Sequence, residues 1–350
     1  MTNAGFDPRN LVKGQSLFIP GIGQVEVMRR YDSHNRTVVR VKPVGAEEKR
    51  IVVKTFNFNG GGMETSNEEA AKVQKKITEY RGLLMTAGVP VTGYISFLTS
   101  TISDGSTFLI QLEPHAGNTA SELIINWKIE AVCELAKAIC QKIVKPLFLN
   151  ASDPANDSMV SVGLDLHLRN ITCGSVMDEE GGINPIYIDY FPWKTREGEN
   201  YSLEYPEPKD EQVKKLGIFR HYNKAGLIIN LFISLCSVRP EGAQLYYDLL
   251  EKFLRSEGFS KVESEIDKYL GEKNLEIAKD KGEIQKMIED ENWGFEQIFK
   301  WRLLACAAAF YRPEFGGSLK KVFEHTHFSN QPLSPGAMSS VKDMVLQMFA

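Results

Sequence analysis

The sequence predicts an α+β protein of two parts, and its residue pattern changes at about position 113. Before it, valine-rich runs alternate with short turn segments, which is typical of antiparallel strands. After Ala120, apolar residues recur every three or four positions, which is typical of helices. A chain of 350 residues is long enough for two such parts. We expect a small β-rich part at residues 1–113 and a larger, mainly helical part at residues 114–350.

The first part is expected to hold five strands with one helix inserted after the third. The strands are expected at Gln24–Tyr31, Arg36–Val44, Lys49–Phe56, Val91–Ser100 and Ser106–Leu112. Ser66 and Glu69 have the spacing of a capping box, which predicts a helix from there to about Ala87. The preceding Gly60-Gly61-Gly62 fits a flexible linker, with a phosphate-cradling loop as the alternative.

The second part is expected to begin with a long helix from Ala120 to about Val144, which Pro146 would stop. A short β-like interval at Met159–Tyr190 interrupts the helical pattern. Further helices are then expected near Asp210–Cys236, Gly242–Glu257, Lys261–Asp290 and Gly294–Phe310.

Composition excludes several classes of function. Lys and Arg total 41 against 45 Asp and Glu, so no basic excess indicates binding to nucleic acid or to an anionic membrane. The longest uncharged apolar run, Ala225–Val238, is too short to cross a bilayer and contains Asn230, so we expect a buried helix. Five cysteines without a C-x-x-C pair fit a reducing compartment. Met1–Asn10 lacks the apolar core of a signal peptide, and we expect a cytoplasmic protein.

The interval Met159–Tyr190 carries the residues that suggest a reaction. Asn170 follows Asp165 by five positions, and Asp189 ends an apolar strand pattern. Asp165 is placed to accept the proton of an attacking hydroxyl, while Asn170 and Asp189 offer the oxygen ligands that Mg²⁺ prefers. This layout predicts phosphoryl transfer. The alternative is that Asp165 and Asn170 are turn residues that bond their own backbone, with Asp189 as a strand-end cap.

Phosphoryl transfer also needs a cation on the phosphates, and Lys54 is the candidate. Its flanking residues in Val52-Val53-Lys54-Thr55-Phe56 are apolar, which favours partial burial and therefore a charged partner. Glu79 on the following helix is the expected partner, with Glu68 or Glu69 as alternatives if the helix register differs.

The chain resembles the protein-kinase-like superfamily in the order of its elements and of six residues: Lys54, Glu79, Asp165, His167, Asn170 and Asp189. The run D-L-H-L-R-N at 165–170 is similar to the loop H-G-D-L-H-x-x-N of the aminoglycoside phosphotransferase and choline kinase branch. The resemblance covers roughly residues 24–191. It implies a two-lobed protein-kinase-like fold, with a small five-stranded antiparallel β lobe carrying one helix and a larger, mainly helical lobe.

The resemblance also implies a place for ATP. Gln111–Gly117 is similar to the hinge whose backbone groups hold adenine in that branch, which makes Glu113 and His115 candidate nucleotide contacts. The turn Ser33-His34-Asn35 stands where the branch has its phosphate-covering loop, with Gly21-Ile22-Gly23 as a weaker candidate.

Three features depart from the family pattern. The histidine two places before the catalytic aspartate is Gly163 here, Asp189 is followed by Tyr190 instead of a D-F-G motif, and no complete G-x-G-x-x-G is present. The missing histidine is mainly structural in the family, so its loss removes no catalytic group. His167 is expected to hold the loop by a hydrogen bond.

These observations predict a kinase that uses ATP and Mg²⁺ to phosphorylate a hydroxyl of a small molecule. Asp165 would act on the hydroxyl, Asn170 and Asp189 would hold Mg²⁺, and Lys54, steadied by Glu79, would contact the phosphates. The alternatives are a pseudokinase that binds a nucleotide or a partner, and a protein kinase, which Glu204–Pro208 faintly suggests by its likeness to an A-P-E segment. The sequence leaves the acceptor, the choice of ATP or GTP, and the oligomeric state open.

Overall fold

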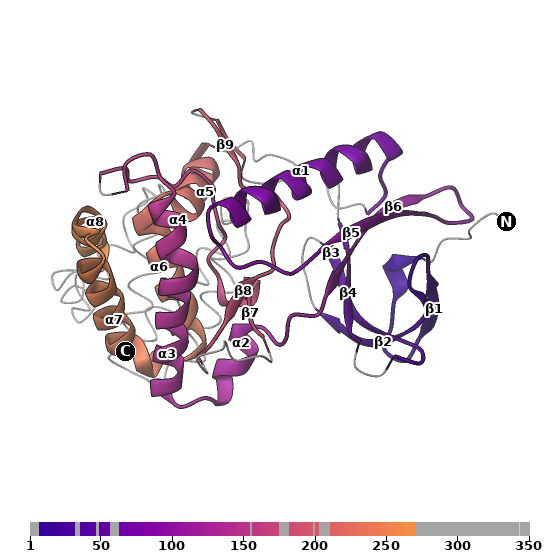
Figure 1. Ribbon diagram of the computed structural model, residues 1–350, viewed down its shortest axis with the longest axis horizontal. Coiled ribbons are helices and arrows are strands. Elements are labelled where there is room, and N and C mark those ends of the chain that lie inside the picture. The colour runs from indigo at the N-terminus through magenta and orange to yellow at the C-terminus, as the bar shows by residue number, and fades with distance from the viewer. Residues whose placement is uncertain are drawn as a thin grey trace.

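The computed structural model describes residues 7–31, 36–46, 49–56, 63–154, 156–174, 182–198, 200–202, 211–270 and 343. Within these ranges the chain forms an antiparallel sheet at one end and a group of packed helices at the other (Figure 1). The helix α1 lies along both, above the junction in the view of Figure 1. The α+β class is therefore as predicted.

The sheet has six strands in the order β1-β2-β3-β4-β6-β5. Their bounds are Ser16–Ile19 (β1), Gly23–Tyr31 (β2), Arg36–Pro43 (β3), Ile51–Phe56 (β4), Ser96–Thr101 (β5) and Thr107–Pro114 (β6). The prediction of five strands is wrong by one, because the four-residue β1 is too short to show an alternating pattern. The expected strand at Val91–Ser100 starts only at Ser96, and Val91 forms an isolated bridge with Tyr187.

The two faces of the sheet carry different residues, because successive side chains of a strand point to opposite sides. One face contributes to a buried apolar cluster that includes Val25, Val27, Val39, Val41, Val53 and Leu112. On β4 and β6, Lys54 pairs in register with Gln111, and Val52 pairs with Glu113. These residues alternate with Val53 and Leu112 and therefore belong to the opposite face.

Helix α1, Asn67–Thr86, begins where the capping pattern predicts, because the Ser66 hydroxyl accepts a hydrogen bond from the Glu69 amide at 3.1 Å. Its buried face consists of Ala70, Val73, Ile77, Tyr80 and Leu84. These residues belong to the same apolar cluster as the cores of α3 and α6. The same cluster includes Phe56 and Leu109 of the sheet, so α1 packs in a core that the sheet and the helices share.

The expected helix at 120–144 is divided into α2 (Ala120–Leu123), a 3-10 turn, α3 (Ile129–Ile139) and a π-helical turn at Cys140–Val144. The prediction that Pro146 stops the helix is wrong. Pro146 lies in the first turn of α4 (Lys145–Leu149), where a residue without an amide hydrogen is tolerated. The π-helical turn before it is closed by the Lys145 amide on the Cys140 carbonyl.

The remaining elements surround the β-like interval and complete the helical part. Two short hairpins pair β7 (Ile171–Cys173) with β8 (Pro185–Tyr187), and β9 (Arg196–Glu197) with β10 (Asn200–Tyr201). The helices are α5 (Glu211–Tyr222), α6 (Lys224–Val238), α7 (Ala243–Ser256) and α8 (Ser260–Leu270). The expected helix at 261–290 begins as α8, while its continuation and the one at 294–310 lie outside the described residues. Among the described helices, none combines the length and apolar character that crossing a membrane requires.

Candidate active site

The loop from Leu164 to Asn170 presents its polar residues on one side. Leu164, Leu166 and Leu168 are fully buried and anchor the loop in the core, so the residues between them are turned away from it. The His167 ring accepts a hydrogen bond from the Arg169 amide at 3.1 Å and caps a 3-10 turn that ends at Asn170. The expected loop-holding role of His167 is confirmed.

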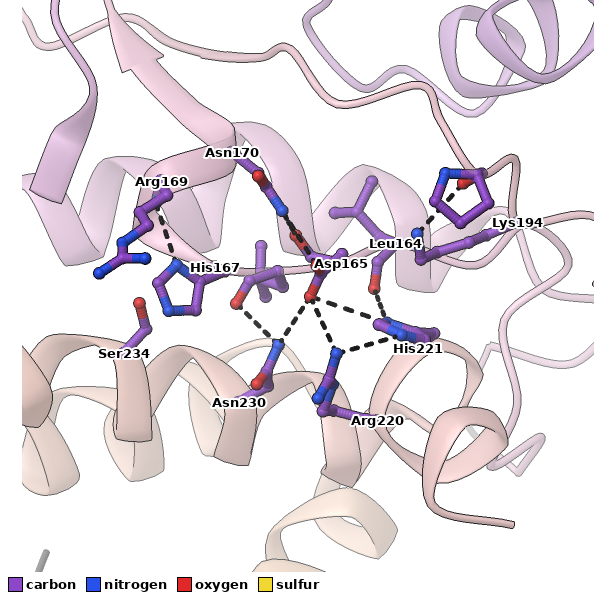
Figure 2. Close-up of polar contacts among 12 residues, drawn as sticks. Leu164, Asp165, His167, Arg169, Asn170, Lys194, Arg220, His221, Asn230 and Ser234 are labelled. Atoms are coloured by element: carbon purple, nitrogen blue, oxygen red, sulfur yellow. Dashed lines mark hydrogen bonds and ion pairs between the residues drawn. The ribbon is translucent and has the colours of Figure 1, made fainter. Parts of the chain in front are cut away.

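Hydrogen-bond donors contact both oxygens of the Asp165 carboxylate. The Asn170 side-chain amide donates to Oδ2 at 3.1 Å and to the Asp165 carbonyl at 3.2 Å. From α6, the Asn230 amide donates to Oδ1 at 3.4 Å and to the Leu166 carbonyl at 3.2 Å. Figure 2 shows Asn170 and Asn230 on different sides of the carboxylate. The carboxylate is therefore fixed in orientation.

Positive charges also surround Asp165. Arg220 Nη2 lies 3.9 Å from Oδ1, and the Lys194 ammonium is buried nearby, where it donates to the Pro192 carbonyl at 3.2 Å (Figure 2). Burial by itself would raise the pKa of Asp165, but the nearby charges, foremost that of Arg220, outweigh burial and hold this pKa well below its usual range. Asp165 is therefore ionised at neutral pH.

His221 is a neutral neighbour of the same carboxylate. Burial, with Arg220 and Lys194 close by, lowers the pKa of His221 well below its ordinary value. Its partners assign the tautomer: Nδ1 lies 3.3 Å from the Leu164 carbonyl and donates to it, so Nε2 accepts from Arg220 at 3.4 Å. His221 therefore adds no charge to the site.

The hairpin β7–β8 brings Asp189 to the Asp165 loop. Ile171 pairs with Tyr187, and the Ile188 amide donates to the Asn170 carbonyl at 2.9 Å. Asp189 follows directly and is only 7% exposed. The backbone hydrogen bond from Ile188 to Asn170 therefore holds the residue before Asp189 against Asn170. Asn170 and Asp189 are the two predicted metal residues.

Lys54 reaches this backbone from the sheet. Its ammonium donates to the Ile188 carbonyl at 2.7 Å and forms an ion pair with Glu113. The side chains of Lys54 and Glu113 are 3% and 2% exposed. Gln111 supports the pair by donating to Glu113 at 3.0 Å. The structure therefore brings Lys54, Asp165, Asn170 and Asp189 into one connected set.

Glu79 does not belong to this set. Its side chain is exposed on α1 and lies 3.8 Å from both Lys75 and Lys76. The expected pair of Lys54 with Glu79 is absent from the described contacts, and Glu113 on the adjacent strand β6 takes the place of Glu79. The physical reason is register, because the positions of α1 that face the core include Ile77 and Tyr80 on either side of Glu79.

The segment after β6 fits closely against the helical part. Gly117 has φ of 102°, and a Cβ at this position would lie 2.6 Å from the Cys173 carbonyl oxygen, so only glycine is accommodated. The His115 amide donates to the Arg50 carbonyl at 3.1 Å. Burial, together with the charge of Arg40, lowers the pKa of His115 to about 4. The predicted adenine contacts at Glu113 and His115 stay predictions, and Ser33, His34 and Asn35 lie outside the described residues.

The glycine at position 163 has a steric explanation. A Cβ on Gly163 would lie 2.6 Å from the ring of Tyr222, so no side chain fits there. The Tyr80 hydroxyl donates to the Gly163 carbonyl at 2.8 Å, and the Gly163 amide donates to the Lys194 carbonyl at 2.9 Å. Packing by Tyr222 and Tyr80 therefore holds the backbone ahead of Asp165, at the place where the family pattern has histidine.

The described residues hold no cluster of three His, Cys, Asp or Glu side chains that would form an all-protein metal site. Mg²⁺ does not require one, because it is usually bound by one or two carboxylates together with phosphates and water. The donor set fits this requirement: Asn170 uses its amide nitrogen on Asp165, which leaves its side-chain oxygen for a cation, and Asp189 supplies a buried carboxylate.

Sequence reasoning missed Arg220, Lys194 and the role of Asn230. The signal for Asn230 was present, since it is a polar residue in an apolar run whose side chains from Lys224 to Cys236 are all buried. A buried amide requires partners, and those partners are Asp165 and Leu166. Arg220 and Lys194 stand in no recognisable motif, and only the packing of α5 against the loop brings Arg220 to Asp165.

No family model matches the sequence, and no curated protein matches it. Among solved structures, one described as the structure of vaccinia related kinase 3 aligns over 96% of this chain and 91% of its own, at 9% identity and a TM-score of 0.35. A likeness of this size does not identify a function, so the proposal below depends on the contacts of this chain.

Proposed function

We propose that the protein is a phosphotransferase with a protein-kinase-like fold, which uses ATP and Mg²⁺ to phosphorylate a hydroxyl of a small molecule. One observation carries the proposal. Hydrogen bonds link Lys54 to Ile188, Ile188 to Asn170, and Asn170 to Asp165, so residues from three distant segments meet beside Asp189. Together they supply the groups that phosphoryl transfer requires: a cation from Lys54, carboxylates from Asp165 and Asp189, and an amide from Asn170.

Asp165 is the residue that acts on the acceptor. Its ionised carboxylate accepts a hydrogen bond from the acceptor hydroxyl and turns the hydroxyl oxygen toward the phosphorus. Because its pKa is held low, its main contribution is orientation, and the proton reaches it only as the new bond forms. Asn170 and Asn230 keep the carboxylate in place during this step.

Asn170 and Asp189 are the residues that would hold Mg²⁺, which when bound supplies charge neutralisation on the phosphates. Lys54 would contribute a second positive charge to the same phosphates. Glu113 steadies Lys54 from within the sheet, in the role that the sequence assigned to Glu79. The nucleotide site would therefore not depend on the position of α1, since the charged partner of Lys54 lies on β6.

The metal assignment is tested with Asp189→Ala and, as control, Asp248→Ala, which removes an exposed carboxylate on α7. We expect ATP with Mg²⁺ to raise the melting temperature of the wild type and of Asp248→Ala. The increase should disappear in Asp189→Ala, because neither water nor Asn170 replaces the lost charge. An unchanged response of folded Asp189→Ala to ATP and Mg²⁺ would overturn the assignment.

The second candidate function is a pseudokinase, and the Lys54 pair favours it. The ammonium already has Glu113 and the Ile188 carbonyl as partners in a nearly dry environment, so binding phosphate there requires a rearrangement. A pseudokinase would bind a nucleotide or a partner without transferring phosphate. Phosphate release from ATP, measured with and without hydroxylated acceptors, separates the phosphotransferase from the pseudokinase, because only the phosphotransferase turns ATP over.

A further inference from the structure

The side of the site next to Asp165 contains two buried cations, Arg220 and Lys194. The Arg220 side chain is 15% exposed, and its Nε is buried without a hydrogen-bond partner among the described residues. Lys194 is 2% exposed, and its described hydrogen bond goes to the carbonyl of Pro192. Both charges lie close enough to Asp165 to lower the pKa of its carboxyl group.

The charges at this position do not balance. Among the described residues, Asp165 is the one carboxylate within ion-pair distance of Arg220, and Lys194 has no carboxylate within that distance. His221 is neutral and contributes no charge. Two positive charges therefore stand beside the one carboxylate of Asp165, because neither cation has a described ion pair with Asp189, the other buried carboxylate of the site. Burying an uncompensated charge is costly.

The contact of Arg220 with Asp165 is also incomplete. The guanidinium presents several N–H groups in a planar fork that matches a carboxylate or a phosphate with two parallel hydrogen bonds. Here a single nitrogen, Nη2, approaches Asp165 Oδ1 at 3.9 Å, which is beyond hydrogen-bond distance. The Asp165 oxygens instead receive amides from Asn170 and Asn230. The donors of Arg220 are thus largely left for another group.

We propose that Arg220 and Lys194 bind an anionic group, a carboxylate or a phosphate, carried by the molecule whose hydroxyl Asp165 orients. The acceptor would then be a hydroxylated acid or a phosphorylated alcohol rather than a neutral sugar or amine. The substrate class rests on the phosphotransfer proposed above, whereas the anion site itself does not require it. The γ-phosphoryl group of the nucleotide is the other source of the same chemistry.

The test uses three probes that share one carbon skeleton: glycerate, glycerol 3-phosphate and neutral glycerol. Their binding to the nucleotide-free, full-length protein is measured by calorimetry. We expect at least one anionic probe to bind more than 10-fold tighter than glycerol, and Arg220→Gln to remove most of that preference. The control is Arg255→Gln, which removes the same charge from an exposed position on α7 and should change nothing. Arg220→Lys keeps the charge but lacks the planar guanidinium, so its affinity for the anionic probe should lie between those of the wild type and Arg220→Gln. Such an intermediate affinity would show that the loss in Arg220→Gln is not a folding defect.

A second arm separates the two sources of the anion. If the acceptor supplies it, saturating Mg²⁺ with a non-hydrolysable ATP analogue leaves anion binding intact. If the γ-phosphoryl group occupies the subsite, the analogue abolishes anion binding, and the proposed acceptor class is overturned. Equal binding of the anions and glycerol, or anion binding that Arg220→Gln and Arg220→Lys both leave unchanged, overturns the anion site even where ATP binds normally. Arg220-dependent anion binding in a protein that fails to bind ATP supports the anion site and overturns the phosphotransfer.

Discussion

Lys54 and Asp165 are both held by charged or polar neighbours, but they are held in different ways. Lys54 forms an ion pair with Glu113 on the next strand of the sheet, and both side chains are almost fully buried. Asp165 is 20% exposed and has two amides and an excess of positive charge around it, all from the helical part. The charge of Lys54 is thus balanced by a carboxylate of the protein. The positive charges beside Asp165 would be balanced by the anionic ligand proposed above.

The Lys54 pair should account for the largest effect on stability. Lys54→Met leaves Glu113 buried without its cation, and removing one partner of a buried pair costs about 3–5 kcal/mol in the free energy of unfolding. Urea unfolding measures this cost.

Glu79→Gln is the control for this experiment, because it removes a carboxylate from exposed pairs with Lys75 and Lys76. Its expected cost is below about 1 kcal/mol. If Glu79→Gln destabilises the protein as much as Lys54→Met, Glu79 rather than Glu113 is the partner of Lys54 in solution.

Near Asp165, Asn230→Ala should lower the free energy of unfolding by less than Lys54→Met and by more than Glu79→Gln. The change leaves the buried Leu166 carbonyl without its donor and removes one donor from Asp165, at a cost of about 1–3 kcal/mol. Ser237→Ala on the same helix removes a hydroxyl whose described hydrogen bond goes to the nearby Ser234 carbonyl, and it should cost about 0.5 kcal/mol or less. Equal unfolding midpoints for the two variants would show that Asn230 does not support the loop.

The same two regions show what the sequence could and could not predict. Lys54 lies within β4, Asp165 and Asn170 lie in the loop before β7, and Asp189 follows β8. Their meeting was predicted because their order in the sequence resembles that of the protein-kinase-like superfamily. The partner of Lys54 was misassigned because the register of α1 depends on which of its residues face the core, and Ile77 and Tyr80 occupy those positions. Arg220 reaches Asp165 through the packing of α5, which no local pattern encodes.

His115 should produce the smallest effect, visible as a dependence of stability on pH. Its pKa is about 4 in the folded protein and close to 6.5 when unfolded, so the unfolded state binds more protons between these values. Stability should therefore fall as the pH is lowered from about 6.5 to about 4. The loss is about 1 kcal/mol, because solvent screens a half-buried ring. His115→Gln should reduce this loss, and an identical pH profile in the variant would contradict the assignment.

The most direct test of the proposed chemistry is a paired measurement on the wild type and Asp165→Asn. The variant keeps the shape of the side chain and removes its charge, so calorimetry should find ATP binding nearly unchanged. Phosphate transfer, or basal ATP hydrolysis, should fall about 10²–10⁴-fold, because Asp165 acts on the acceptor rather than on the nucleotide. If the wild type binds ATP but turns it over no faster than Asp165→Asn with every acceptor offered, the protein is a pseudokinase and the catalytic role of Asp165 is refuted.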